Sequence, residues 1–211
     1  MKLLYCAITL SISPLFAQIG TPPVITSIAG AGLSTPPVTQ ISAGGIISIF
    51  GTNFTPAGVT HTLQASDITG GTTMPTNLAQ TCVQIGGIPA PLSYVSSTQI
   101  NAQTTAVASS GSAQVTVVAN CGTVGQSSSQ PFTVQLASSA PEFLYFKSSS
   151  VAAVQVSTGA YVGTPGLIAG ASFAPAKPGD VLTIYGVGFG ATNPNVAPGI
   201  LATAAASTPP R

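Results

Sequence analysis

Apolar and polar residues alternate along several short stretches of this chain, and one such stretch occurs twice. Residues 47–54 have the order apolar, hydroxyl, apolar, aromatic, glycine, two turn-type residues and phenylalanine, and residues 182–189 repeat that order. Alternation with a period of two predicts a β-strand with one buried face, and recurrence indicates one structural unit used twice. Phe54 and Phe189 occupy matching positions, so both are expected to cap a core.

Further alternating segments predict an all-β chain. Turn-type residues separate them, and residues 55–80, rich in Thr, Gly and Pro, are expected to form a long loop with one short strand near 62–65. About seven short strands within residues 18–137 are typical of an immunoglobulin-like β-sandwich. The expected strands are 24–28, 46–50, 82–85, 92–95, 99–104, 114–118 and 132–136.

Residues 138–211 are expected to form a second, incomplete β unit with a tail rich in Ala and Pro. Its predicted strands are 142–146, 151–156 and 181–185. A complete sandwich of this kind needs about 100 residues, which is more than this part contains. Either the chain is a fragment of a longer protein or this part is an incomplete sheet, and we favour the fragment.

The N-terminal residues indicate a signal peptide. Lys2 precedes a mostly apolar run at residues 3–16, and Ala17 before Gln18 offers a cleavage point, which defines residues 1–17 as the leader. The run is too short for a membrane span and contains Pro14. We therefore expect a protein that is secreted or held at the cell surface, with no membrane span after cleavage.

Charged residues are scarce, and this excludes some classes of function. They make up 3% of the chain, against about 25% in an average protein. Hydrophobic residues make up 45% of the chain, which is enough to build a core. Cleavage after Ala17 would leave three cations and three acids, a net charge of zero. Nucleic-acid binding needs several clustered cationic contacts, so it is not expected.

Two motifs resemble a known family. Residues 45–54 and 88–103 together resemble uncharacterised C-terminal modules of secreted bacterial proteins, which are similar to the IPT/TIG type of immunoglobulin-like domain, and residues 178–190 match the start of that module's second half. The resemblance implies an immunoglobulin-like fold and export. It implies no catalytic residue, cofactor or ligand, and the fold by itself carries no single function.

Cys82 and Cys121 are the cysteines that remain after export, and an even number in an oxidising compartment favours a disulfide. If strands 82–85 and 114–118 are antiparallel neighbours, the two cysteines lie at adjacent strand ends. The loop-entropy model gives such a bond about 3–4 kcal/mol. Cys82 is out of phase with the apolar face of its strand, so a bulge near residues 120–122 is expected. The alternative is two free thiols.

Candidate catalytic and metal-binding residues are few. His61 is the one histidine and could pair with Asp67, but no serine lies in a nucleophile elbow, and an exposed loop histidine is the expected outcome. The carboxylates are far apart in the sequence, which disfavours general acid–base catalysis as well as zinc or calcium sites. No catalytic, cofactor-binding or metal-binding residue is predicted, and a hydrolase remains a remote alternative.

The remaining hypotheses concern binding. The first is a non-catalytic extracellular β-sandwich module that acts as a spacer or interaction domain. The second is a polysaccharide-binding accessory module in which Tyr94 or Tyr145 stacks on a sugar ring, although the chain has no Trp. A half-buried tyrosine with a bonded hydroxyl is the simpler interpretation of both residues. The expected partner is a protein or a glycan.

Overall fold

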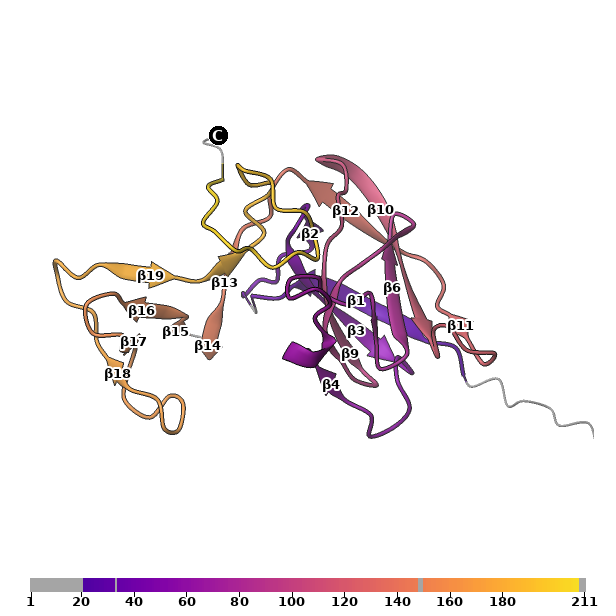
Figure 1. Ribbon diagram of the computed structural model, residues 1–211, viewed down its shortest axis with the longest axis horizontal. Coiled ribbons are helices and arrows are strands. Elements are labelled where there is room, and N and C mark those ends of the chain that lie inside the picture. The colour runs from indigo at the N-terminus through magenta and orange to yellow at the C-terminus, as the bar shows by residue number, and fades with distance from the viewer. Residues whose placement is uncertain (1–20, 33, 148–149, 209–211) are drawn as a thin grey trace, which may run out of the picture.

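The computed structural model describes residues 21–32, 34–147 and 150–208, so the expected signal peptide lies outside the described residues. Residues 24–137 form two β-sheets that face each other (Figure 1). One sheet has the order β1-β3-β9-β8-β4. Its strands are β1 (Val24–Gly30), β3 (Ile46–Thr52), β9 (Gln99–Gln103), β8 (Leu92–Val95) and β4 (His61–Thr62), all paired antiparallel.

The second sheet has the order β2-β12-β10-β6-β5. Short strands β11 and β7 pair with β10 and β6, and all pairings are antiparallel except β2 with β12. The bounds are β2 (Gln40–Ile41), β12 (Phe132–Ala137), β10 (Ser110–Ala119), β6 (Thr81–Ile85), β5 (Asn77–Leu78), β11 (Ser127–Ser128) and β7 (Ile88–Pro89). The predicted all-β sandwich is confirmed.

The core lies between these sheets and comes from the inward residues of the alternating strands. Ile49 and Ile100 stand opposite each other on β3 and β9, and Val83 and Val117 stand opposite each other on β6 and β10. All four side chains are fully buried. Burying side chains of this size stabilises the fold by roughly 1.5–3 kcal/mol each. The sandwich therefore has a complete apolar interior.

The expected strands are all present, with different limits. β10 begins at Ser110, earlier than the alternation predicted. The strand expected near residues 62–65 is only β4, and a 3₁₀ turn, η1 (Ala65–Asp67), follows it. Asn53, the second of the two turn-type residues in the first copy of the repeat, has a φ of 61° and follows the last residue of β3.

The C-terminal region, residues 138–208, forms three small sheets beside the sandwich (Figure 1). β13 pairs with β20, β14 pairs with β15, and the third sheet has the order β18-β17-β16-β19. Their bounds are β13 (Glu142–Phe143), β20 (Gly186–Val187), β14 (Tyr145–Lys147), β15 (Ser150–Val151), β16 (Ala153–Gln155), β17 (Tyr161–Val162), β18 (Phe173–Ala174) and β19 (Leu182–Ile184). Each strand expected at residues 142–146 and 151–156 is thus split in two.

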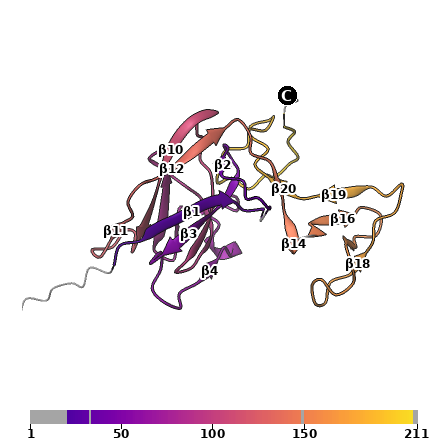
Figure 2. The same ribbon diagram turned by 180° about the vertical axis from the view of Figure 1, so that it is seen from behind.

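An aromatic cluster holds the C-terminal sheets together. The ring of Phe146 meets Tyr161 edge-on with centroids 5.0 Å apart, and meets Phe173 in the same way at 5.6 Å. Tyr161 and Phe173 are 5.4 Å apart. Edge-to-face rings are a favourable packing geometry. From behind, Figure 2 shows the last described residues, in yellow, returning from these sheets toward the sandwich.

The repeat in the sequence is also a repeat in strand pairing. In the first copy, β3 pairs with β1. In the second copy, β20 pairs with β13 and β19 pairs with β16, so β13 and β16 together take the place of β1. The residues at matching positions are paired in both copies. The hairpin β14–β15 is inserted between β13 and β16, which explains the split strands. The matched pairs are Ile25↔Gly51 with Phe143↔Gly186, and Ile28↔Ile49 with Ala153↔Ile184.

A glycine under a phenylalanine ring occurs at the same place in both copies. A Cβ added to Gly51 would lie 2.6 Å from Cζ of Phe54, and one added to Gly186 would lie 2.9 Å from Cζ of Phe189. Only glycine leaves room for such a ring. The outcome differs, however: Phe54 is 0% exposed and Phe189 is 49% exposed. The expectation that Phe189 caps a core is therefore wrong, because no described strand covers it.

Candidate functional site

The structure contains a disulfide between Cys82 and Cys121, whose Cα atoms are 5.8 Å apart. β6 and β10 are antiparallel neighbours, with Cys82 opposite Val118. Cys121 lies beyond the end of β10, and Asn120, with a φ of 51°, turns the chain there. The sequence predicted a bulge near residues 120–122 that would bring the two cysteines to one side of the sheet. The left-handed turn at Asn120 has this effect, since Cys121 reaches Cys82.

His61 and Asp67 are in contact, and His61 lies on a strand and is half-buried, whereas an exposed loop histidine was expected. His61 lies on β4, and its Nε2 is 2.9 Å from Oδ2 of Asp67. The same carboxylate oxygen accepts the backbone N–H of Gln64 at 2.7 Å. The hydrogen bond from His61, followed by that from Gln64, lowers the pKa of Asp67. Within the described residues no hydroxyl side chain bonds to either group, so the pair fastens the turn after β4.

Tyr94 and Tyr145, the proposed sugar contacts, lie in different sheets. Tyr94 is on β8, opposite Thr62 and Asn101. Tyr145 is on β14, opposite Val151. Both side chains are half-buried. The two tyrosines belong to different strand pairs, and a role in glycan binding stays a prediction for each residue separately.

Glu142 is a buried carboxylate that the sequence did not single out. It begins β13 and is 5% exposed. Its oxygens accept the backbone N–H of Gly32 at 2.7 Å, the backbone N–H of Ser34 at 2.9 Å and the hydroxyl of Ser34. A Cβ on Gly30 or Gly32 would overlap the Glu142 side chain. The loop after β1 is therefore shaped around this carboxylate, which joins the C-terminal region to the sandwich.

A signal for this contact was present in the sequence. In a chain with three acidic residues, a glutamate at the start of an apolar strand needs a partner, because a buried charge is costly without hydrogen bonds. The partners are two backbone N–H groups and one hydroxyl of a loop more than 100 residues away along the chain, which no local pattern identifies.

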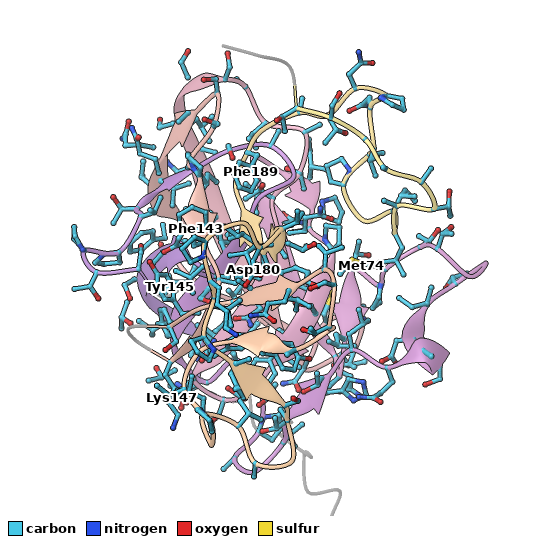
Figure 3. All side chains as sticks on the ribbon, turned by 90° about the vertical axis from the view of Figure 1, so that its left-hand side faces the viewer. Met74, Phe143, Tyr145, Lys147, Asp180 and Phe189 are labelled. Carbon is cyan, nitrogen blue, oxygen red and sulfur yellow. A yellow bond between two sulfur atoms is a disulfide. The ribbon has the colours of Figure 1, made fainter. Side chains whose placement is uncertain are left out.

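Residues 190–206 form a second connection between the two parts. The backbone N–H of Met74 donates to the carbonyl of Gly199, and the N–H of Leu201 donates to the carbonyl of Thr72, both at 2.8 Å. The N–H of Gly199 also donates to Oε1 of Gln103 at 2.6 Å. The last described residues thus lie against the sandwich near the loop that contains Met74 (Figure 3).

A cavity of about 800 Å³ lies between this segment and the sandwich. Gln103, one of the two amide side chains in its wall, is bonded at both ends, since its Nε2 also donates to the carbonyl of Gly44 at 3.1 Å. No lining residue is charged, so the cavity presents a mainly apolar, uncharged surface. Its lining includes Ile46, Met74, Gln103, Val107, Ile200 and Leu201.

Two facing, mainly antiparallel sheets with an apolar interior between them define an immunoglobulin-like β-sandwich module. The model of the IPT/TIG domain matches residues 23–136, and the chain belongs to the IPT/TIG domain family. This confirms the resemblance of residues 45–54 and 88–103 to the IPT/TIG type of immunoglobulin-like domain.

No curated protein matches the chain. One similar solved structure is the crystal structure of a protein from Bacteroides thetaiotaomicron described as a "Putative phosphatase". It is 22% identical, with a TM-score of 0.32, and the match covers 55% of this chain and 17% of that one. A likeness at this level carries no argument about function.

No described helix is long and apolar enough to cross a membrane. No group of three or more His, Cys, Asp and Glu side chains comes together in residues 21–32, 34–147 and 150–208 in a way that could hold a metal ion.

Proposed function

We propose that this chain is a non-catalytic module of an extracellular or cell-surface protein, acting as a spacer and interaction domain. The observation that carries the proposal is the Glu142 contact. A buried carboxylate with three donors from one sandwich loop holds the C-terminal region in a defined position. A module whose function is geometric needs such a fixed connection more than it needs reactive groups.

The other ionisable contacts support the same proposal. His61 and Asp67 bond to each other and to a turn, and Asp180 accepts the backbone N–H of Lys177 in another turn at 2.8 Å. Each of these groups has a structural partner. The Cys82–Cys121 disulfide suits an oxidising compartment, in agreement with the predicted leader at residues 1–17. The proposal accordingly divides the chain into the leader, a sandwich at 18–137 and a second β unit at 138–211.

Export is tested by expressing the full chain in a bacterium with a periplasm. Mass spectrometry of the exported protein should find a mature N-terminus at Gln18, and a non-reducing peptide map should find Cys82 joined to Cys121. A chain that begins at Gln18 after an initiator methionine is the control and should stay in the cytoplasm. A full-length chain that stays in the cytoplasm and keeps residues 1–17 would refute the extracellular assignment.

The glycan-binding alternative has its own experiment. The exported protein is incubated with insoluble polysaccharides, and the bound fraction is compared with that of Tyr94→Ala and Tyr145→Ala variants. Retention that one substitution abolishes would favour an accessory binding module. Absence of retention on every polysaccharide would remove this alternative and leave the spacer and interaction role.

A further inference from the structure

Residues 193–207 form a loop that is closed on itself. The N–H of Asn193 donates to the carbonyl of Ser207 at 2.6 Å, and the N–H of Ser207 donates back to the carbonyl of Asn193 at 3.0 Å. Both hydrogen bonds lie within the described residues, so they define this loop whatever residues follow it. Compact surface loops with paired ends are frequently functional. Residues 193–207 are called the closed loop below.

The closed loop is fastened to the sandwich near its middle. Ile200 forms an antiparallel bridge with Thr73. The backbone hydrogen bonds of Met74 and Leu201 lie on either side of this bridge, and the N–H of Gly199 bonds to a side chain of β9. Figure 3 shows Met74 beside this part of the chain. These contacts hold the closed loop at a set distance from the sandwich, so the cavity of about 800 Å³ between them has two fixed walls.

The sandwich wall of the cavity is the outer face of three neighbouring strands. Ile46, Ser93 and Gln103 belong to β3, β8 and β9, and all three line the cavity. Ile47 and Ala102, their neighbours on β3 and β9, are buried in the core. Successive side chains of a strand point to opposite faces, so Ile46 and Gln103 point outward. The cavity therefore lies between a sheet face and the loop that covers it.

Small side chains make this cavity roomy. Methyl groups leave space that larger apolar side chains would fill, and protein interiors otherwise contain few voids larger than a water molecule. The volume of about 800 Å³ falls within the range of small-molecule sites, roughly 300–1,000 Å³. The alanines that residues 190–206 contribute to the lining are Ala191, Ala197, Ala202, Ala204, Ala205 and Ala206.

The chemistry of the lining selects an uncharged ligand. No lining residue is charged, so a charged ligand would lose hydration without gaining an ion pair. Gln103 is bonded at both ends, and the hydroxyls of Ser93 and Thr192 donate to backbone carbonyls. Asn195, which is exposed, is the remaining polar side chain of the lining. The ligand that fits is rich in hydrocarbon and carries at most one polar group.

We propose that the cavity between the closed loop and the outer face of β3, β9 and β8 binds an uncharged, hydrocarbon-rich small molecule. Ile200 and Leu201 line the cavity and are 40% and 41% exposed, so the ligand covers apolar surface that water now reaches. Burial of apolar surface is the driving force for binding. A ligand that contacts both walls also ties the closed loop more tightly to the sandwich. This site goes beyond the proposed spacer and interaction role and does not depend on it.

The test compares two dyes that share one ring system, using the full chain. N-phenylnaphthylamine is uncharged and becomes more fluorescent in apolar surroundings, and anilinonaphthalene sulfonate carries an added sulfonate. The expected result is saturable binding of one uncharged dye per chain, with at least about tenfold weaker binding of the anion. Equal affinity for the two dyes would contradict an uncharged site.

A pair of matched variants tests the position of the site. Ala106→Trp places the largest side chain into the cavity from the sandwich wall and should weaken binding of the uncharged dye at least about tenfold. Ala57→Trp, at an exposed alanine in the loop after β3 and outside the lining, is the control and should leave the affinity unchanged. Circular dichroism and urea unfolding establish that both variants are folded. Unchanged affinity in folded Ala106→Trp would refute the site.

Amide chemical shifts and hydrogen exchange in the labelled wild type locate the dye without any substitution. The largest shifts should fall on lining residues, and the amides of Gly199 and Leu201 should exchange more slowly when the dye is bound. Shifts centred on the exposed Phe143 and Phe189 would reveal adventitious binding to an apolar surface and would overturn the inference. Absence of saturable binding by the folded chain would do the same, and it would leave the proposed extracellular role standing.

Discussion

Replacing Glu142 tests whether one buried carboxylate holds the C-terminal region on the sandwich. In Glu142→Ala, the buried N–H of Gly32 loses its acceptor, and an unsatisfied buried donor costs about 1–3 kcal/mol. The two donors of Ser34 are only part-buried and can turn to water, so their loss adds roughly 1 kcal/mol. The expected total is a loss of about 2–4 kcal/mol. Glu142→Gln keeps one acceptor oxygen but places an NH₂ group against one of the donors. Its loss of stability should be about half that of Glu142→Ala.

The assay is urea unfolding followed by far-ultraviolet circular dichroism, with hydrogen exchange measured at the amides of Gly32 and Ser34. Both amides should exchange faster in the variants, and the Ala change should have the larger effect. Asp180→Asn is a suitable control because this exposed carboxylate bonds only within the C-terminal region, to Lys177 and Gln155. Its cost should be within about 0.5 kcal/mol. Unchanged stability and unchanged exchange in Glu142→Ala would refute the reasoning.

Three further predictions concern the core, the disulfide and acidity. Ile49→Ala should cost about 2–5 kcal/mol, whereas Ile184→Ala at the half-exposed matching position should cost less than about 1 kcal/mol; equal losses in urea unfolding would contradict this. Cys82→Ala should lower stability by about 2–5 kcal/mol, and an oxidised wild type no more stable than the variant would count against a structural bond. The lowered pKa of Asp67 means that its stabilising contribution is present at neutral pH and is lost as acidification protonates the folded carboxylate, below about pH 4. The melting temperature should therefore be nearly flat from about pH 4 to 9 and fall below that range, with a smaller fall in Asp67→Asn; an equal fall in that variant would exclude the contact as the cause.

Alternation along the chain was sufficient to predict the strands that line the sandwich core. Strands such as β3 and β12 each present one apolar face over at least five residues, and that signal is local. The two-residue strands β5, β7 and β11 are too short for any period and were missed. They form because neighbouring long strands offer unpaired backbone groups, and this depends on the folded sheet.

The errors at the candidate sites have the same physical origin. The Cys82–Cys121 pairing was predicted because antiparallel neighbours bring strand ends together by topology. The Glu142 contact depends on donors of a distant loop. Phe189 is exposed because no strand among the described residues covers its ring. A residue pattern describes what a segment offers to its surroundings, whereas burial also depends on what lies next to it.

The disulfide has a mechanical consequence when the chain is pulled from its two ends. Cys82 and Cys121 are separated by 39 residues, and the covalent bond carries the load past everything between them, including the whole of β7, β8, β9 and β10. Even when the rest of the sandwich is drawn out, this closed loop cannot lengthen, which removes roughly 130 Å from the reach of the extended chain. Reduction of one covalent bond would release that slack, so the redox state of the surroundings sets how far the stretched molecule extends.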